Sequence, residues 1–208
     1  MSSESRKRSD GRDTMAKVIQ FATAELELHG SVKFNLDRVI EQSGVSRSSV
    51  YHHFGNRDGV LAAIEIQRFT NFMMSGVVVV RELLSEMSDI EEWLTAIDEM
   101  LNSDNGADAR ARRVQRVGTF VVAQENEELM AALSKVQMEG TRHLAETLDM
   151  AVSRGLMHPT APTLGIAYLF QSILVGRILV DLDEDPEANS AWVAAGISSL
   201  RHLINGAG

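Results

Sequence analysis

Residues 46–53, with the sequence SRSSVYHH, bring seven hydrogen-bonding side chains together around a single apolar residue, Val50. A helix packed inside a protein would carry leucine and alanine at such positions. A catalytic loop would need a nucleophile that faces a base. Hydroxyls, a guanidinium and aromatic rings with polar edges are instead groups that hydrogen-bond to phosphates and base edges. The stretch therefore indicates recognition of a nucleic acid rather than bond breaking.

Two short helices joined by a glycine turn would present these side chains to the outside. The first is expected to begin after Asn35, which is a residue of the N-cap type, and to end at Gly44, which can take a positive φ. Ser46 is expected to cap the second helix, over residues 47–53. The apolar residues that would bury these helices are Leu36, Val39 and Ile40 in the first, and Val45, Val50 and Phe54 around the second. This is the helix-turn-helix pattern, whose second helix lies in the major groove of DNA.

The residue types predict different roles within this motif. Arg47 can bond guanine through two donors, which would read sequence. Ser49, Tyr51, His53 and Arg57 are placed to bind phosphate, which supplies affinity with little sequence preference. The predicted partner is double-stranded DNA, contacted by Asn35, Ser46, Arg47, Ser48, Ser49, Tyr51, His52, His53 and Arg57.

The sequence GVSRSSVYHHFGNRDGVL, residues 44–61, resembles the helix-turn-helix of TetR-type (tetracycline-repressor-like) regulators. The likeness covers about residues 12–65, and beyond it only size and helical layout agree. One departure is Ile40, where these motifs usually have alanine at the contact between the two helices. The residues that carry the likeness are Gly44-Val45-Ser46, Ser49-Val50, Tyr51 to Phe54 and Arg57-Asp58, with Arg12, Phe21-Ala22 and Gly30 upstream.

The resemblance implies a repressor that binds a near-palindromic operator as a homodimer and is released by a small molecule. The dimer would form through the last two helices as a four-helix bundle, in which Leu169, Ile173, Gly176 and Val180 meet Trp192, Ala195 and Leu203. The effector would be largely apolar, because methionines and aromatic residues suit adaptable apolar pockets. The residues expected to line its pocket are Phe72, Met73, Trp93, Met100, Phe120, Met138, His143 and Tyr168.

Helical periodicity dominates the remainder of the chain, so the expected fold class is all-α. The β-branched runs at 76–80 and 118–123 are expected to be helical, because they have no hairpin partner and burial can override a weak propensity. Further helices are expected over about 13–29, from near 57, from about 89, and over 108–123, 125–155, 161–181 and 187–204. The predicted organisation is a basic flexible arm (1–12), an N-terminal helix-turn-helix domain (13–57) and a larger C-terminal ligand-binding and dimerisation domain (58–208).

Charge is unevenly distributed along the 208 residues, whose formal net charge is −9. Residues 1–68 hold 10 of the 20 Lys and Arg residues and 9 of the 29 acidic ones, so they carry a net +1 and the remainder a net −10. This asymmetry favours one end that faces an anion and a body that does not. Arg6, Lys7, Arg8 and Arg12 could also reach phosphate or the minor groove from the arm, although basic tails often have no specific role.

The absence of cysteine and of a secretory signal predicts a cytoplasmic protein. The apolar run at 164–180 contains Gln171, Ser172 and Arg177, which favours a helix at a subunit interface over a membrane span. The six histidines form no metal-binding helical pair, and neither a nucleophile elbow nor a phosphate-binding loop is present, so no cofactor and no enzyme activity are expected. The alternatives are a helical protein-interaction module and a cofactor-free enzyme without a recognisable catalytic motif.

Overall fold

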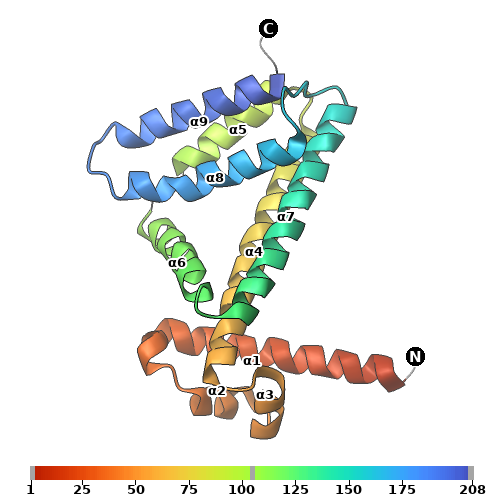
Figure 1. Cartoon of the computed structure of the whole chain (residues 1–208), viewed down its shortest axis with the longest axis vertical. Helices are drawn as coiled ribbons and strands as arrows, with labels where there is room; N and C mark the ends of the chain where they lie inside the picture. Colours follow the sequence, from red (N-terminus) through yellow and green to blue (C-terminus); the bar gives the residue numbers. More distant parts are fainter. Residues whose placement is uncertain (1–2, 104–105, 206–208) are drawn as a thin grey trace. The chain divides into compact units, whose positions relative to one another are not determined.

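The computed structural model describes residues 3–103 and 106–205, with side chains from residue 13 onward. Within these residues the chain is helical and contains no strand, as predicted (Figure 1). The helices are α1 (Ser3–Lys33), α2 (Leu36–Ser43), α3 (Arg47–Phe54), α4 (Arg57–Glu86), α5 (Ile90–Ser103), α6 (Ala107–Ala123), α7 (Glu127–Ser153), α8 (Thr163–Asp181) and α9 (Ala188–Asn205).

Both β-branched runs are helical, in α4 and in α6. Val77 and Val80 of the first run are buried in the hydrophobic core, so tertiary burial outweighs the local β-propensity there. The main difference lies in α1, which begins at Ser3 rather than near residue 13 and bends at Gly30, where φ is 71°. The expected flexible arm therefore has a helical backbone from residue 3, while its basic side chains lie outside the described residues.

The chain divides into two compact units, Met1–Arg68 and Phe69–Gly208. The first unit extends beyond residue 57, because the opening turns of α4 belong to its core. Val60 and Ile64 of α4 are fully buried there against Val18, Ala22 and the residues of α2 and α3. α1 and the start of α4 thus pack against the helix-turn-helix and complete its core.

The second unit has a separate core, built from the remainder of α4 and from α5, α7, α8 and α9. Trp93 of α5 is almost completely buried and lies against Phe170 of α8, with ring centroids 6.3 Å apart. Gly140 of α7 allows a close approach to α4, since a Cβ placed there would lie 2.6 Å from the Met73 side chain. α9 packs against both α5 and α8 (Figure 1).

Candidate functional site

The helix-turn-helix forms from local signals in the sequence. Asn35 caps α2, and its side-chain oxygen accepts hydrogen bonds from the N–H groups of Asp37 at 2.9 Å and Arg38 at 3.3 Å. Gly44 ends α2 in the left-handed conformation, with φ 64°, and donates its N–H to Ile40 O at 3.1 Å. Ser46 then caps α3 by accepting the Ser49 N–H at 3.2 Å. These caps define both ends of the turn.

α3 buries only Val50, which is 1% exposed, while Val45 and Phe54 pack at the edge of the core. Tyr51 is 44% exposed, and the Arg47 side chain is 58% exposed. Ser46, Ser48 and His52 are also exposed, and Ser49 and His53 are half-buried. The polar face of α3 is therefore displayed on the surface of its unit, as major-groove recognition requires.

Arg47 pairs with Asp37 of α2 across the turn, with 2.8 Å between Arg47 Nη2 and Asp37 Oδ1. The hydrogen bond to Asp37 raises the pKa of Arg47, and Tyr51 contributes in the same direction. Both partners are more than half exposed, so this pair adds little stability and can be exchanged for another acceptor. The contact holds the guanidinium at the outer face of the motif.

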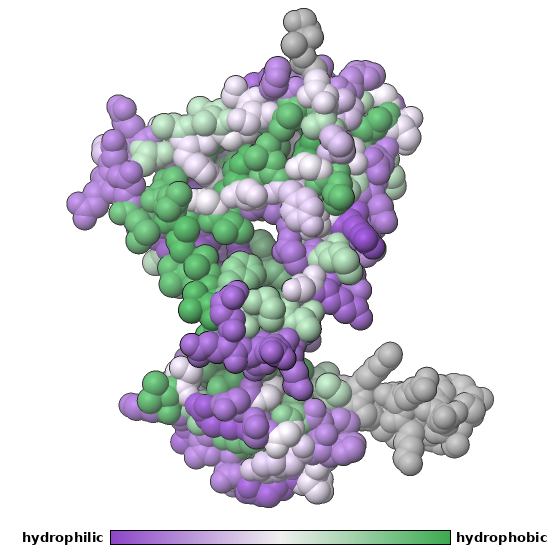
Figure 2. All heavy atoms as spheres, viewed as in Figure 1, coloured by the Kyte–Doolittle hydropathy of each residue, from purple (hydrophilic) through white to green (hydrophobic). Residues whose placement is uncertain are grey.

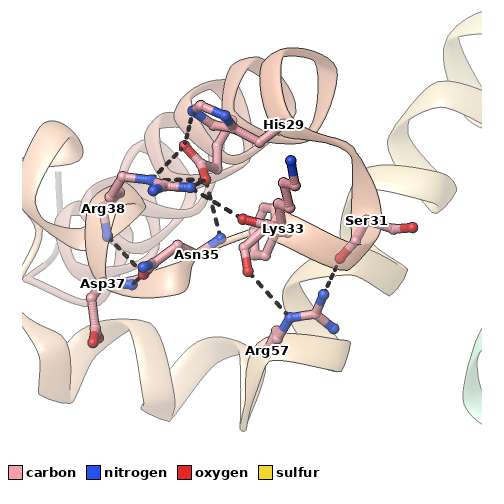
Figure 3. Close-up of polar contacts among 9 residues, drawn as sticks. His29, Ser31, Lys33, Asn35, Asp37, Arg38 and Arg57 are labelled. Atoms are coloured by element: carbon pink, nitrogen blue, oxygen red, sulfur yellow. Dashed lines mark hydrogen bonds and ion pairs between the residues drawn. The ribbon is translucent and has the colours of Figure 1, made fainter.

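A buried polar cluster that the sequence analysis did not single out joins α1 to α2 (Figure 3). Glu25 of α1 is only 3% exposed. Its carboxylate accepts hydrogen bonds from Asn35 N–H at 3.1 Å and from Arg38 Nε and Nη2 at 3.0 and 2.5 Å. Arg38 Nη2 also donates to Lys33 O at 3.1 Å. The cluster therefore ties the end of α1 and the cap of α2 to one carboxylate.

Electrostatics within this cluster favour the ionised carboxylate. The hydrogen bond from Arg38 lowers the pKa of Glu25 below its ordinary value of 4.5, although burial acts in the opposite direction. The pKa of Arg38 is raised by the same hydrogen bond. A signal was present in the sequence, because Glu25 continues the helical spacing of the buried residues Val18 and Ala22. A carboxylate on the buried face of a helix must have a hydrogen-bond donor or a cation beside it.

Arg57, which was predicted to bind phosphate, makes its described contacts within its own unit. Its Nη2 donates to Ser31 O, and its Nε donates to Phe34 O at 3.5 Å (Figure 3). Its guanidinium also pairs with Asp58 at 3.1 Å and lies 5.5 Å from the Phe34 ring centroid. These contacts indicate that Arg57 braces the end of α1 and the residue that follows it, while its phosphate role stays a prediction.

We expect Arg57→Gln to lower the melting temperature, because three acceptors lose their cationic donor. The slope of log affinity for duplex DNA against log salt is expected to stay within about 0.3 of the wild-type slope, whereas loss of one phosphate contact would change it by about 0.9. Circular dichroism melting and DNA titrations over a range of salt concentrations measure the two quantities. A lower slope at an unchanged melting temperature would show that Arg57 contacts a DNA phosphate.

The second unit contains a cavity of about 450 Å³ between α4, α5, α6 and α8, within the usual size range of small-molecule sites. Phe72 and Met100 of the predicted pocket line it. Phe72, Met73 and Phe120 surround a smaller space of about 30 Å³. The residues that line the larger cavity are Phe72, Ser75, Gly76, Val79, Val80, Met100, Leu101, Ser103, Ala109, Arg112, Arg113, Arg116, Phe170, Leu174 and Arg177.

The other predicted pocket residues do not line this cavity. Trp93 is part of the core. Met138, His143 and Tyr168 are exposed, because each lies on the outward face of its helix. Four arginines that the prediction of an apolar pocket did not include line the cavity instead: Arg112, Arg113, Arg116 and Arg177.

Comparison with protein families identifies the class to which this arrangement belongs. Residues 18–64 match the model of "Bacterial regulatory proteins, tetR family". This segment contains most of α1, all of α2 and α3, and the turns of α4 that close the first core. Comparison of the sequence with curated proteins gives no match.

Solved structures of TetR-family regulators share the fold over nearly the whole chain. A regulator from Mesorhizobium loti superposes with a TM-score of 0.67 at 16% identity, covering 94% of this chain and 98% of that one. Escherichia coli NemR in its reduced form gives 0.60 at 13% identity, with 94% and 98% covered. A TetR regulator from Haloarcula marismortui gives 0.61 at 14% identity, with 93% and 100% covered.

The capped turn and the exposed polar face of α3 define a helix-turn-helix of the type found in bacterial regulatory proteins. The resemblance noted in the sequence is confirmed: residues 18–64 match the tetR-family model, and the chain has the fold of solved TetR-family regulators.

Proposed function

We propose that the protein is a cytoplasmic repressor that binds a near-palindromic operator as a homodimer and is released by a small molecule. The observation that carries this proposal is the outward polar face of α3, held in place by Val50 and by the caps at Asn35 and Ser46. One such helix covers half of a typical operator, so two copies related by a two-fold axis would read both halves.

The surface of α8 supports a dimer, but through a different face from the predicted one. Leu169, Ile173, Gly176 and Val180 are half-buried, and Gly196 of α9 in the same subunit lies against Ile173. The side of α8 opposite its buried residues Ile166, Phe170 and Arg177 is exposed and mostly apolar, and its residues fall within about 80° of arc at 100° per residue. This exposed stripe consists of Leu164, Tyr168, Ser172, Leu179 and Leu182.

α8 is also the one helix among the described residues that is long and apolar enough to cross a membrane, yet only 22% of the residues in its apolar segment are buried within the chain. Such an apolar, poorly covered helix needs a partner surface. Figure 2 shows hydrophobic residues gathered over the C-terminal end of α8 and the neighbouring α6. A second copy would cover the stripe, and Tyr168 would then serve the interface rather than the pocket.

We expect Leu179→Glu to raise the dissociation constant of the dimer by roughly a hundredfold, because two-fold symmetry places the buried charge in the interface twice. Leu179 is 71% exposed in the single chain, so the substitution should not affect folding. Sedimentation equilibrium measures the dissociation constant. Val122→Glu on α6, at a residue that is 58% exposed, is the matched control and should leave association unchanged. If Val122→Glu weakened association more than Leu179→Glu, the interface would lie on α6 instead.

Release by a ligand would act through α4. This helix supplies Val60 and Ile64 to the first core, and Phe72, Val79 and Val80 to the wall of the cavity. A ligand that fills the cavity and favours a different position of α4 would change the separation of the two recognition helices. Operator affinity then falls only if the ligand binds the DNA-incompetent state more tightly.

Titration with random duplex DNA at low and high salt tests the proposal. A DNA-binding protein should lose affinity steeply as salt rises, because bound cations are released from the phosphates. A protein-interaction module or an enzyme should bind weakly at both concentrations, and this outcome would overturn the proposal. Selection of bound fragments from the source genome would then identify the operator.

A further inference from the structure

The wall of the cavity carries an unusual concentration of positive charge. Residues 69–208 contain 10 of the 20 Lys and Arg residues, although the net charge of this segment is −10. Four of these ten line the cavity. A fifth, Arg110, lies beside the cavity, with 3.7 Å between its Nε and Asp181 Oδ1. The lining includes no aspartate or glutamate among the described residues. Half of the Lys and Arg residues of this acidic unit therefore lie in or beside the wall of one cavity.

Arg113 and Arg177 make side-chain contacts with neighbouring elements. Arg113 pairs with Asp181 through hydrogen bonds of 2.5 and 2.8 Å. The hydrogen bond from Arg113 lowers the pKa of Asp181, so this carboxylate stays ionised and offsets one positive charge. Arg177 donates to Leu101 O and, at 2.6 Å, to Asn189 Oδ1. Both side chains join α8 to a neighbouring element at the edge of the cavity.

The other two, Arg112 and Arg116, lie one turn apart on α6 and therefore on the same face of that helix. The Arg116 guanidinium stacks on Phe72 of α4, with its central carbon 3.3 Å from the ring centroid. In such a stack the ring contacts the guanidinium face, whereas the N–H donors lie in the guanidinium plane. Arg116 therefore contacts α4 at the wall of the cavity.

The rest of the lining is apolar, with Val79, Val80, Met100, Phe170 and Leu174 around the space. An ion enters such a space only when a fixed charge of opposite sign compensates its lost hydration. A neutral apolar molecule would gain no charge-assisted hydrogen bond from the guanidinium groups. The lining therefore suits a molecule with an apolar body and a negative head.

We propose that the effector is an organic anion with an apolar body, such as a carboxylate or a sulfonate, whose head group is bound by Arg112 and Arg116. This inference rests on the proposed function of the cavity as the effector site. It also replaces the largely apolar effector expected from the sequence. Because Arg116 stacks on Phe72, the head group would be sensed at α4, the helix that also enters the first core.

Calorimetric titration of the full-length protein with matched pairs of compounds tests the inference. 2-Naphthoate and 2-naphthamide share one apolar body, decanoate and decanamide share another, and each pair differs in charge. We expect the better carboxylate to bind at least about tenfold more tightly than its amide, as charge-assisted hydrogen bonds do over neutral ones. Arg116→Gln should abolish this preference, and Arg112→Gln should reduce it.

Arg142→Gln on α7 is the control, because it removes the same charge from an exposed residue outside the lining. It should leave the preference unchanged. Equal binding of acid and amide, failure of both acids to bind at millimolar concentration, or an unchanged preference in a folded Arg116→Gln protein would overturn the inference. Duplex DNA titration of the same samples separates the two proposals: DNA binding without an anion preference refutes only the effector class, and an anion preference without DNA binding refutes only the regulator.

Discussion

Arg47→Ala is expected to weaken binding to the operator by about 1–3 kcal/mol, from roughly fivefold to more than a hundredfold, and to relax the preference at one base pair. In the free protein the Arg47 guanidinium lies on Asp37, where both partners are exposed. Exchange of this carboxylate for a guanine edge costs little, because exposed ion pairs contribute little. A guanine offers two acceptors that match the two donors of the guanidinium.

The measurement for Arg47 is a competition assay in which the operator and its single-base variants compete for the protein. Arg47→Lys is the matched variant, because it keeps the charge but cannot form the paired donors. It should retain most of the affinity for random duplex DNA and lose discrimination at the same base pair. Unchanged discrimination in both variants would assign base reading to other residues of α3.

Glu25→Ala is expected to lower the melting temperature by several degrees, a larger effect than that of any exposed carboxylate on α1. Glu25 is buried, and its loss would leave Arg38 Nε and the Asn35 N–H without the carboxylate that accepts their hydrogen bonds. Glu27→Ala is the control, because Glu27 is two residues away on the same helix and pairs with Arg68 at the surface. Thermal unfolding followed by circular dichroism compares them, and equal effects of the two substitutions would refute a special role for the cluster.

The contribution of Glu25 to stability also has a defined pH dependence. Its pKa in the folded protein lies below the ordinary value of 4.5, so the folded state binds the proton less readily than the unfolded state does. The contribution is therefore complete above about pH 4.5 and is lost as the pH falls through the lowered pKa. Urea unfolding at decreasing pH should show the wild-type and Glu25→Ala proteins converging in acid. A difference between the two proteins that grows in acid would contradict the assigned direction.

The helix-turn-helix could be predicted from the sequence because its signals are local. The caps at Asn35 and Ser46 and the turn at Gly44 act within a few residues of themselves. The apolar residues under α3 follow from helical spacing alone. The helical state of the valine-rich run at 76–80 was also predicted, although its reason, burial of Val77 and Val80, lies in distant segments.

The sequence by itself determined the all-helical fold and the polar face of α3, since capping and periodicity act between neighbouring residues. Only the tertiary structure decided which long side chains meet. Arg57 donates to a carbonyl group at the end of α1, Glu25 pairs with Arg38 thirteen residues away, and the arginines of α6 lie at a cavity. Partners that are distant in sequence are chosen by how helices pack, and the same arginine on a helix surface can bind DNA, a ligand or its own backbone.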